Sequence, residues 1–270
     1  MENLAPNNKR IVKNTLLLYV RMLFLMVVSL YTSRVVLNAL GIEDFGIYNV
    51  VGGMVAMFSM LSGSLSAAIT RFITYELGRG DREKLRTIFS SAVTIQLGLA
   101  AIIIILAEVL GIWFLNSKMT IPLDRLAAAN WVFQFSVLTF AINLVSVPYN
   151  ASIIAHERMS AFAYISIFEA VGKLAIAYLI TISPIDRLVF YAILMCAVAL
   201  IVRFTYGIYC KRHFEECMYH FIFDKNLLKD MFGFAGWNFI GASSSVLRDQ
   251  GGNVVINLFC GPAVNAARGI

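Results

Sequence analysis

The chain has 270 residues, of which 59% are apolar and only 14% are charged. Average soluble domains are roughly 45–50% apolar and about 25% charged, so this composition excludes a soluble enzyme, a disordered chain and a disulfide-stapled secreted module. The mean hydropathy of +0.76 agrees. We therefore expect an all-α membrane protein, a polytopic bundle of helices.

Long stretches without charge mark the expected membrane spans, because a span needs about 20 apolar residues. Three such stretches have no charge at all, and four further windows stay apolar around one or two charges. No stretch alternates for long enough to suggest a barrel strand. In chain order, the seven predicted helices are Asn14–Leu37, Phe45–Thr70, Thr87–Ala107, Leu126–Ala155, Met159–Ile182, Arg187–Cys210 and Met231–Cys260.

The placement of lysine and arginine predicts the orientation, because basic loops remain cytoplasmic. With the N-terminus inside, thirteen basic residues fall in cytoplasmic segments and only four in outer loops. The net charge of +6 follows from this asymmetry and requires no nucleic-acid partner. The four outer basic residues are Lys118, Arg125, Arg187 and Arg268.

A short internal repeat suggests how the chain is divided. The sequence Val35-Val36-Leu37-Asn38 returns in the last predicted helix as Val254-Val255-Ile256-Asn257, and each copy is soon followed by a glycine. A duplicated six-helix lobe predicts such a match, although the match is short enough to arise by chance. The expected parts are a cytoplasmic segment (1–13), a six-helix lobe (14–210), a connecting loop (211–230) and the first helix of an incomplete second lobe (231–270).

Several charged residues lie inside the predicted spans, where contact with lipid is costly. They are expected to face the interior of the bundle or a water-filled cavity. Arg203 lies near a helix end, where its side chain can reach the interface. The intramembrane charges are Arg21, Glu108, Glu169, Lys173, Arg203, Arg248 and Asp249.

Glu169 and Lys173 are four residues apart in one predicted helix and therefore share a face. In one interpretation, the two residues neutralise each other and only support packing. In the other, the Lys173 cation binds an anionic substrate and Glu169 modulates the charge of Lys173. Arg21 has no acidic partner on its own helix.

Two places predict a break or hinge in a helix. Arg248 and Asp249 are followed by Gly251 and Gly252, which weaken a helix and can free backbone groups at a midplane site. A plain kink is the alternative interpretation. Pro148 removes one backbone hydrogen bond and should kink the fourth helix.

The chain offers no credible metal or cofactor motif. Cys210, His213, Cys217 and His220 are suitable zinc ligands. If the segment is helical, the first and the last lie roughly 15 Å apart, too far to share one ion, and only a turn inside the segment could bring them together. We therefore expect no metal and no cofactor.

Three short motifs flank the predicted helix ends. The first lies within Ser33–Tyr48 and follows the pattern L-G-x-x-x-[FY]-G-x-[YF]. The second lies within Ile69–Asp81 and ends Gly-Arg-Gly-Asp, and the third is Val147-Pro148-Tyr149 with Ala155 and Met159. The residues of the first pattern are Leu40, Gly41, Phe45, Gly46 and Tyr48.

With these motifs, the chain from about Lys9 to Ile270 resembles polysaccharide flippases of the Wzx type, in the superfamily that also contains multidrug (MATE) exporters. The resemblance implies that the protein is a transporter and not an enzyme. It would move undecaprenyl-pyrophosphate-linked oligosaccharides across the inner membrane by alternating access, for surface polysaccharide and lipopolysaccharide biosynthesis. Arg21, Lys173 and Arg248 are the candidates for binding the anionic head group, and Glu108, Glu169 and Asp249 for carrying protons.

The expected partners are the lipid bilayer, the lipid-linked substrate, glycan-assembly enzymes and either a missing second lobe or another copy of the chain. Family members have twelve to fourteen helices in two lobes, so this chain corresponds to one lobe and the first helix of the next. A multidrug antiporter is the alternative, although the first helix has no acid. A membrane-embedded polymerase or acyltransferase is a further alternative.

Overall fold

The computed structural model describes residues 4–56, 59–117, 119, 121–183, 185–220 and 225–246. These residues are helical almost throughout and contain no strand, which confirms the all-α membrane fold. The elements are α1 (Leu4–Ala56), α2 (Ser59–Arg79), α3 (Arg82–Leu106), a π-helical turn η1 (Ala107–Gly111), α4 (Ile112–Ser117), α5 (Leu126–Ala155), α6 (Met159–Leu179), η2 (Ile180–Ile182), α7 (Arg187–His213), η3 (Glu215–Cys217) and α8 (Lys225–Val246).

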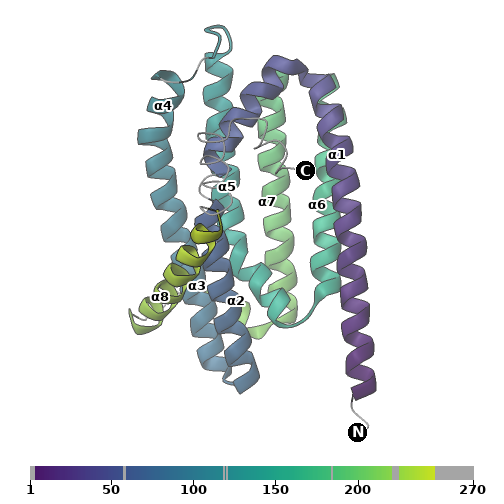
Figure 1. The fold of residues 1–270 in the computed structure, drawn as a ribbon, viewed down its shortest axis with the longest axis vertical. Helices are drawn as coiled ribbons and strands as arrows, with labels where there is room; N and C mark the ends of the chain where they lie inside the picture. Colours follow the sequence, from purple (N-terminus) through teal and green to yellow (C-terminus); the bar gives the residue numbers. More distant parts are fainter. Residues whose placement is uncertain are drawn as a thin grey trace, which may run out of the picture.

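α1 consists of two helical stretches that meet at Gly41. Gly41 has φ +84° and ψ 170°, a left-handed backbone that residues with a Cβ rarely adopt. Figure 1 shows the first stretch rising from the N-terminus, turning over and descending on the other side of the bundle toward α2. The predicted second helix, Phe45–Thr70, therefore corresponds to the descending part of α1 and to α2, which extends to Arg79.

Within the described residues, five helical segments are long and apolar enough to cross a membrane. The first, Val12–Val55, has 44 residues, about twice the length of a single pass, and it contains the first predicted helix and the beginning of the second. The seventh predicted helix is represented by α8, which starts at Lys225, before the predicted Met231; its predicted residues after Val246 lie outside the described part. The five segments are Val12–Val55, Arg82–Ser117, Leu126–Ala155, Met159–Ile182 and Arg187–His213.

α5 lies at the centre of the bundle and contacts α1, α2, α3, α6 and α7. Near one end, Phe133 of α5 packs with Val51, Leu115 and Leu188. α8 packs on α2 through Met231, which is fully buried. Many large apolar side chains on the outer faces of the helices are exposed, as expected where lipid replaces water as the surrounding solvent.

The connections gather at two ends of the bundle, and the predicted inner connections share the end at which the N-terminus lies (Figure 1). At that end, Gly80 has φ +75° and closes α2 by donating its N–H to the Glu76 carbonyl, over 3.0 Å. Asp81 then caps α3 by accepting the Lys84 N–H. The predicted outer connections lie at the opposite end, as the predicted topology requires.

Candidate functional site

A cavity of about 300 Å³ opens between α1, α6 and α7, within the membrane-spanning part of the bundle. It brings together Arg21 from α1 and both Glu169 and Lys173 from α6, three of the residues that the sequence singles out. Its other polar lining residues are Ser29, Thr32 and Ser33 of α1, Ser166 of α6 and Tyr191 of α7. We call this space the charged cavity.

The three charged groups in the charged cavity have different partners. The Lys173 ammonium lies 2.6 Å from the Glu169 carboxylate, and both side chains remain more than one third exposed. The Arg21 guanidinium lies over the Phe162 ring at 4.3 Å, while its Nε is buried without a hydrogen-bond partner. Among the described residues, Arg21 has no carboxylate partner, so the cavity has a net positive charge.

This arrangement suits the binding of an anion. A guanidinium that has given up part of its hydration gains strongly from a phosphate or carboxylate, which accepts its N–H groups in pairs. The Thr32 hydroxyl is also buried without a partner and offers a further polar contact. The Lys173 ammonium keeps further N–H donors for a ligand, while its ion pair with Glu169 offsets its charge.

Among the described residues, the remaining predicted site residues Glu108 and Pro148 do not line the charged cavity. Glu108 lies in η1 and accepts a hydrogen bond from the Gln134 amide of α5, over 3.1 Å. Pro148 is buried within α5, which continues as one helix to Ala155. The other predicted residues, Arg248, Asp249, Gly251 and Gly252, lie outside the described residues.

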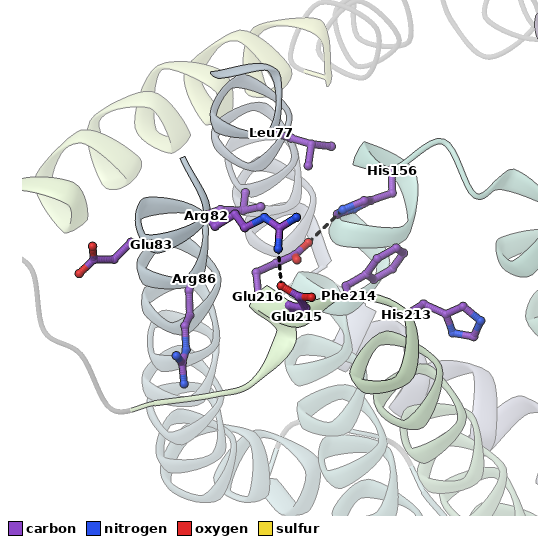
Figure 2. A pocket seen from close by; sticks show the side chains of 10 residues that line it. Leu77, Arg82, Glu83, Arg86, His156, His213, Phe214, Glu215 and Glu216 are labelled. Atoms are coloured by element: carbon purple, nitrogen blue, oxygen red, sulfur yellow. Dashed lines mark hydrogen bonds and ion pairs between the residues drawn. The ribbon is translucent and has the colours of Figure 1, made fainter. Parts of the chain in front are cut away.

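Ion pairs tie η3 to its neighbours at the end of the bundle that holds the N-terminus, around a second, larger space of about 600 Å³. Figure 2 shows His156 pointing at Glu216, and Arg82 pointing at Glu215. The His156 Nε2 lies 3.0 Å from the Glu216 carboxylate, and the His156 ring stacks on Phe214 at 4.0 Å.

The two pKa values at this pair move in opposite directions. Burial lowers the pKa of His156, but the Glu216 carboxylate and the Ser152 carbonyl outweigh it, so the pKa of His156 is raised. Burial raises the pKa of Glu216, but His156 outweighs it, so the pKa of Glu216 is lowered. The pair is therefore charged on both sides in weakly acidic solution.

We expect this pair to give the protein a pH-dependent stability. Because the pKa of His156 is raised in the folded protein, its charged form stabilises the fold. This stabilisation is complete below the unfolded pKa of about 6.5 and is lost as pH rises through the folded pKa. The Glu216 contribution is lost as pH falls below about 4.5. Thermal unfolding between pH 6 and pH 9 should show a loss of up to about 1 kcal/mol in the wild type.

The Glu216→Gln variant should lack this loss, because His156 then has no carboxylate to pair with. Glu83→Gln is the matched control, since Glu83 borders the same space and is exposed without an ion pair in the described part of the chain. An identical pH profile for the wild type and Glu216→Gln would contradict the assignment.

At the opposite end, Arg125 joins three connections. Its Nε donates to Asp44 over 2.8 Å and its Nη1 to Asp186 over 2.6 Å. These pairs raise the pKa of Arg125, and Asp186, whose pKa the arginine lowers against the effect of burial, also caps α7. We refer to Arg125, Asp44 and Asp186 as the outer triad.

A family model for polysaccharide biosynthesis proteins matches residues 11–267, which is nearly the whole chain. The chain belongs to the polysaccharide biosynthesis protein family. The match confirms the resemblance to Wzx-type flippases, and together with the long apolar helices it shows a multi-pass membrane protein of polysaccharide biosynthesis.

One curated relative is an uncharacterized membrane protein of Bacillus subtilis (strain 168), EpsK, which is 22% identical over 124 residues. The matched segment covers 46% of this chain and 24% of EpsK, so the likeness spans about a quarter of the relative's length. No solved structure matches this member of the polysaccharide biosynthesis protein family.

The structure gives physical reasons for two of the motifs that pointed to the polysaccharide biosynthesis protein family. Gly41 of the first motif occupies the left-handed position at which α1 reverses, and Tyr48 of the same motif packs edge-on against Tyr191, with ring centroids 4.7 Å apart. Gly80 and Asp81 of the second motif form the tight connection from α2 to α3.

The suspected zinc pattern is divided by a turn at Phe214, where α7 ends. His213 stacks on Tyr209, and His220 lies 2.7 Å from the Arg86 guanidinium. Among the described residues, no three His, Cys, Asp or Glu side chains gather to hold a metal ion.

Sequence reasoning missed the partners of the predicted charges. Phe162 under Arg21 and Gln134 beside Glu108 are ordinary helix residues, and only tertiary packing reveals their contacts. Arg203 also has a partner that the sequence does not reveal, because its guanidinium lies over the Tyr149 ring of α5 at 3.8 Å. Its planar cation is stabilised by that aromatic face.

Proposed function

We propose that this chain is part of a transporter that moves undecaprenyl-pyrophosphate-linked oligosaccharides across the inner membrane, for surface polysaccharide and lipopolysaccharide biosynthesis. The observation that carries the proposal is the net positive charged cavity, which lies within the spans of a chain from the polysaccharide biosynthesis protein family. A pyrophosphate is the kind of multivalent anion that a partly desolvated arginine binds well.

In this proposal, Arg21, Lys173 and Arg248 hold the pyrophosphate, and Glu108, Glu169 or Asp249 carries protons for coupling. A second lobe or another copy of the chain closes the cavity from the other side, and the two halves alternate in access. Pro148, Gly251 and Gly252 allow the helices to bend. Glycan-assembly enzymes supply the substrate at the inner face.

The outer end of the bundle supports transport over the alternative of a polymerase or acyltransferase. Such an enzyme would need reactive charged groups in an outer connection. Arg125, Asp44 and Asp186 instead satisfy one another in the outer triad. The charged cavity also disfavours a multidrug antiporter for cationic compounds, because Arg21 would repel them.

The test reconstitutes the natural protein that contains this chain into liposomes loaded with an undecaprenyl-pyrophosphate oligosaccharide. Movement is measured as the rate at which a membrane-impermeant lectin gains access to the glycan. We expect this rate to exceed that of protein-free liposomes, and transport of ethidium to be absent. Ethidium transport without oligosaccharide movement would overturn the proposal in favour of the multidrug alternative.

A further inference from the structure

A third cavity, of about 280 Å³, lies between α5, α7 and the descending part of α1. Its lining differs chemically from that of the charged cavity. It contains hydroxyl, amide and aromatic side chains and, among the described residues, no charged one. We call it the neutral cavity; its lining includes Tyr48, Gly52, Ser136, Thr139, Phe140 and Asn143.

The two cavities are neighbours. Met195 of α7 lines both of them. Tyr191 of the charged cavity and Tyr48 of the neutral cavity pack edge to face, with ring centroids 4.7 Å apart. The charged cavity and the neutral cavity therefore meet at Tyr48, Tyr191 and Met195, so groups bound in the two cavities would lie close together.

The polar groups of the neutral cavity lie on one face of α5. Ser136, Thr139 and Asn143 follow one another at spacings of three and four residues, which places them along roughly 10 Å of one helix face. Thr139 donates to the Phe135 carbonyl of its own helix over 2.7 Å. In the described part of the chain, the Ser136 hydroxyl and the Asn143 amide have no hydrogen-bond partner.

Asn143 is exposed near the middle of α5, a helix of 30 apolar-rich residues. An amide without a partner is costly in hydrocarbon, so this face of α5 is expected to border water or a polar ligand rather than lipid. The same argument applies to Lys173 and Glu169, which are half-buried in the middle part of α6. Both cavities therefore open to a polar space.

We propose that the neutral cavity binds the uncharged sugar unit attached directly to the pyrophosphate of the substrate. This inference rests on the proposed function, because it assumes that the pyrophosphate occupies the charged cavity. The Asn143 amide can both donate to and accept from sugar hydroxyls, and the Tyr48 ring offers an apolar surface to the sugar ring. The expected substrates are therefore lipid-linked oligosaccharides in which the sugar next to the pyrophosphate is uncharged.

Gly52 provides a way to fill the neutral cavity without disturbing the helix. A Cβ at Gly52 meets no atom within 4 Å, and the glycine lines the cavity. In Gly52→Leu, the new side chain occupies space that the sugar would need. Gly53→Leu is the matched control, because Gly53 is exposed, also has no atom within 4 Å of its Cβ, and lies outside the lining.

The experiment measures dissociation constants in lipid nanodiscs by native mass spectrometry. The probes are bare undecaprenyl pyrophosphate and the same lipid carrying one glucose, galactose or N-acetylglucosamine. We expect the wild type to bind at least one sugar-bearing probe about tenfold more tightly than the bare lipid. Gly52→Leu and Asn143→Leu should lose this difference while binding the bare lipid as before, and Gly53→Leu should retain it.

Equal affinities for bare and sugar-bearing probes in the wild type would overturn the sugar site. An equal loss in Gly52→Leu and Gly53→Leu would also overturn it. The proposed function fails separately: if Arg21→Gln binds bare undecaprenyl pyrophosphate as the wild type does, the charged cavity is not the pyrophosphate site. Failure of every probe to bind the wild type would overturn both proposals.

Discussion

Replacing Arg21, Lys173 and Arg248 together by glutamine is expected to abolish the export of surface polysaccharide without lowering the amount of protein in the membrane. Each hydrogen bond between a cationic side chain and a phosphate contributes about 1.5–3 kcal/mol. The loss of only two such bonds corresponds to an affinity decrease of at least about 100-fold. Glutamine keeps much of the length and polarity of the original side chains, so packing should change little.

The measurement is the amount of surface polysaccharide made by cells whose only copy of the transporter carries the substitutions. Lys211→Gln is the matched control, because Lys211 is an exposed cation at the end of α7 and lies outside the charged cavity. Normal polysaccharide from the triple variant at normal protein level would contradict the assignment of these three residues.

The Glu169–Lys173 ion pair allows the two interpretations of these residues to be separated in the same assay. If the pair only supports packing, a double variant should leave export intact. In this variant, Glu169 is replaced by its neutral amide counterpart, glutamine, and Lys173 by an uncharged alkyl side chain. If Lys173 binds the substrate, the double variant should export less than the single Glu169→Gln variant. The 2.6 Å separation of the two groups is compatible with either interpretation, and only this comparison distinguishes them.

Substituting alanine for Gly111 is expected to have the largest effect on stability of any single methyl addition among the described helical glycines. A Cβ at Gly111 would overlap the Phe133 ring, which is buried in the core. Gly111 ends the π-helical turn η1, so the backbone and the ring approach each other closely. Overpacking of this kind costs about 1–3 kcal/mol, which lowers the midpoint of thermal unfolding by about 5 °C.

Gly98→Ala is the control for the Gly111 prediction. Gly98 lies in α3 and is exposed, and a Cβ added there meets no atom within 4 Å, so the added methyl group should be neutral or slightly stabilising. A second variant that combines Gly111→Ala with Phe133→Leu should recover part of the lost stability, because the smaller side chain leaves room. Equal unfolding midpoints for Gly111→Ala and Gly98→Ala would show that the ring moves aside without cost.

Much of the fold could be predicted because membrane spans depend on local composition. The uncharged stretch Leu126–Ala155 coincides with α5, and Met159–Ile182 with α6 and η2. The pairing of Glu169 with Lys173 was also predictable, because a spacing of four residues fixes neighbours on any helix. The predicted limits were less accurate around Gly41 and at the start of α8, where the helices extend into polar sequence.

The contacts that complete the candidate site could not be predicted from local sequence. Arg21 and Phe162 are separated by most of the bundle's sequence, and only the packing of α1 on α6 brings them together. The neutral cavity depends on the reversal at Gly41, which returns Tyr48 and Gly52 to α5 and α7. Single serine, threonine and asparagine residues in an apolar helix do not predict a cavity. Their role becomes visible only when the structure shows that they lie on one face of the helix.

The outer triad has a mechanical consequence. Asp44 lies just after the reversal of α1 at Gly41, and Arg125 and Asp186 precede α5 and α7. The two aspartates are 81 and 61 positions from the arginine, yet one guanidinium holds them together. The helices that these residues belong to or precede cannot spread apart at this end without breaking two ion pairs. Alternating exposure is therefore expected to leave the outer ends of these helices together, with the displacement at the opposite end of the bundle.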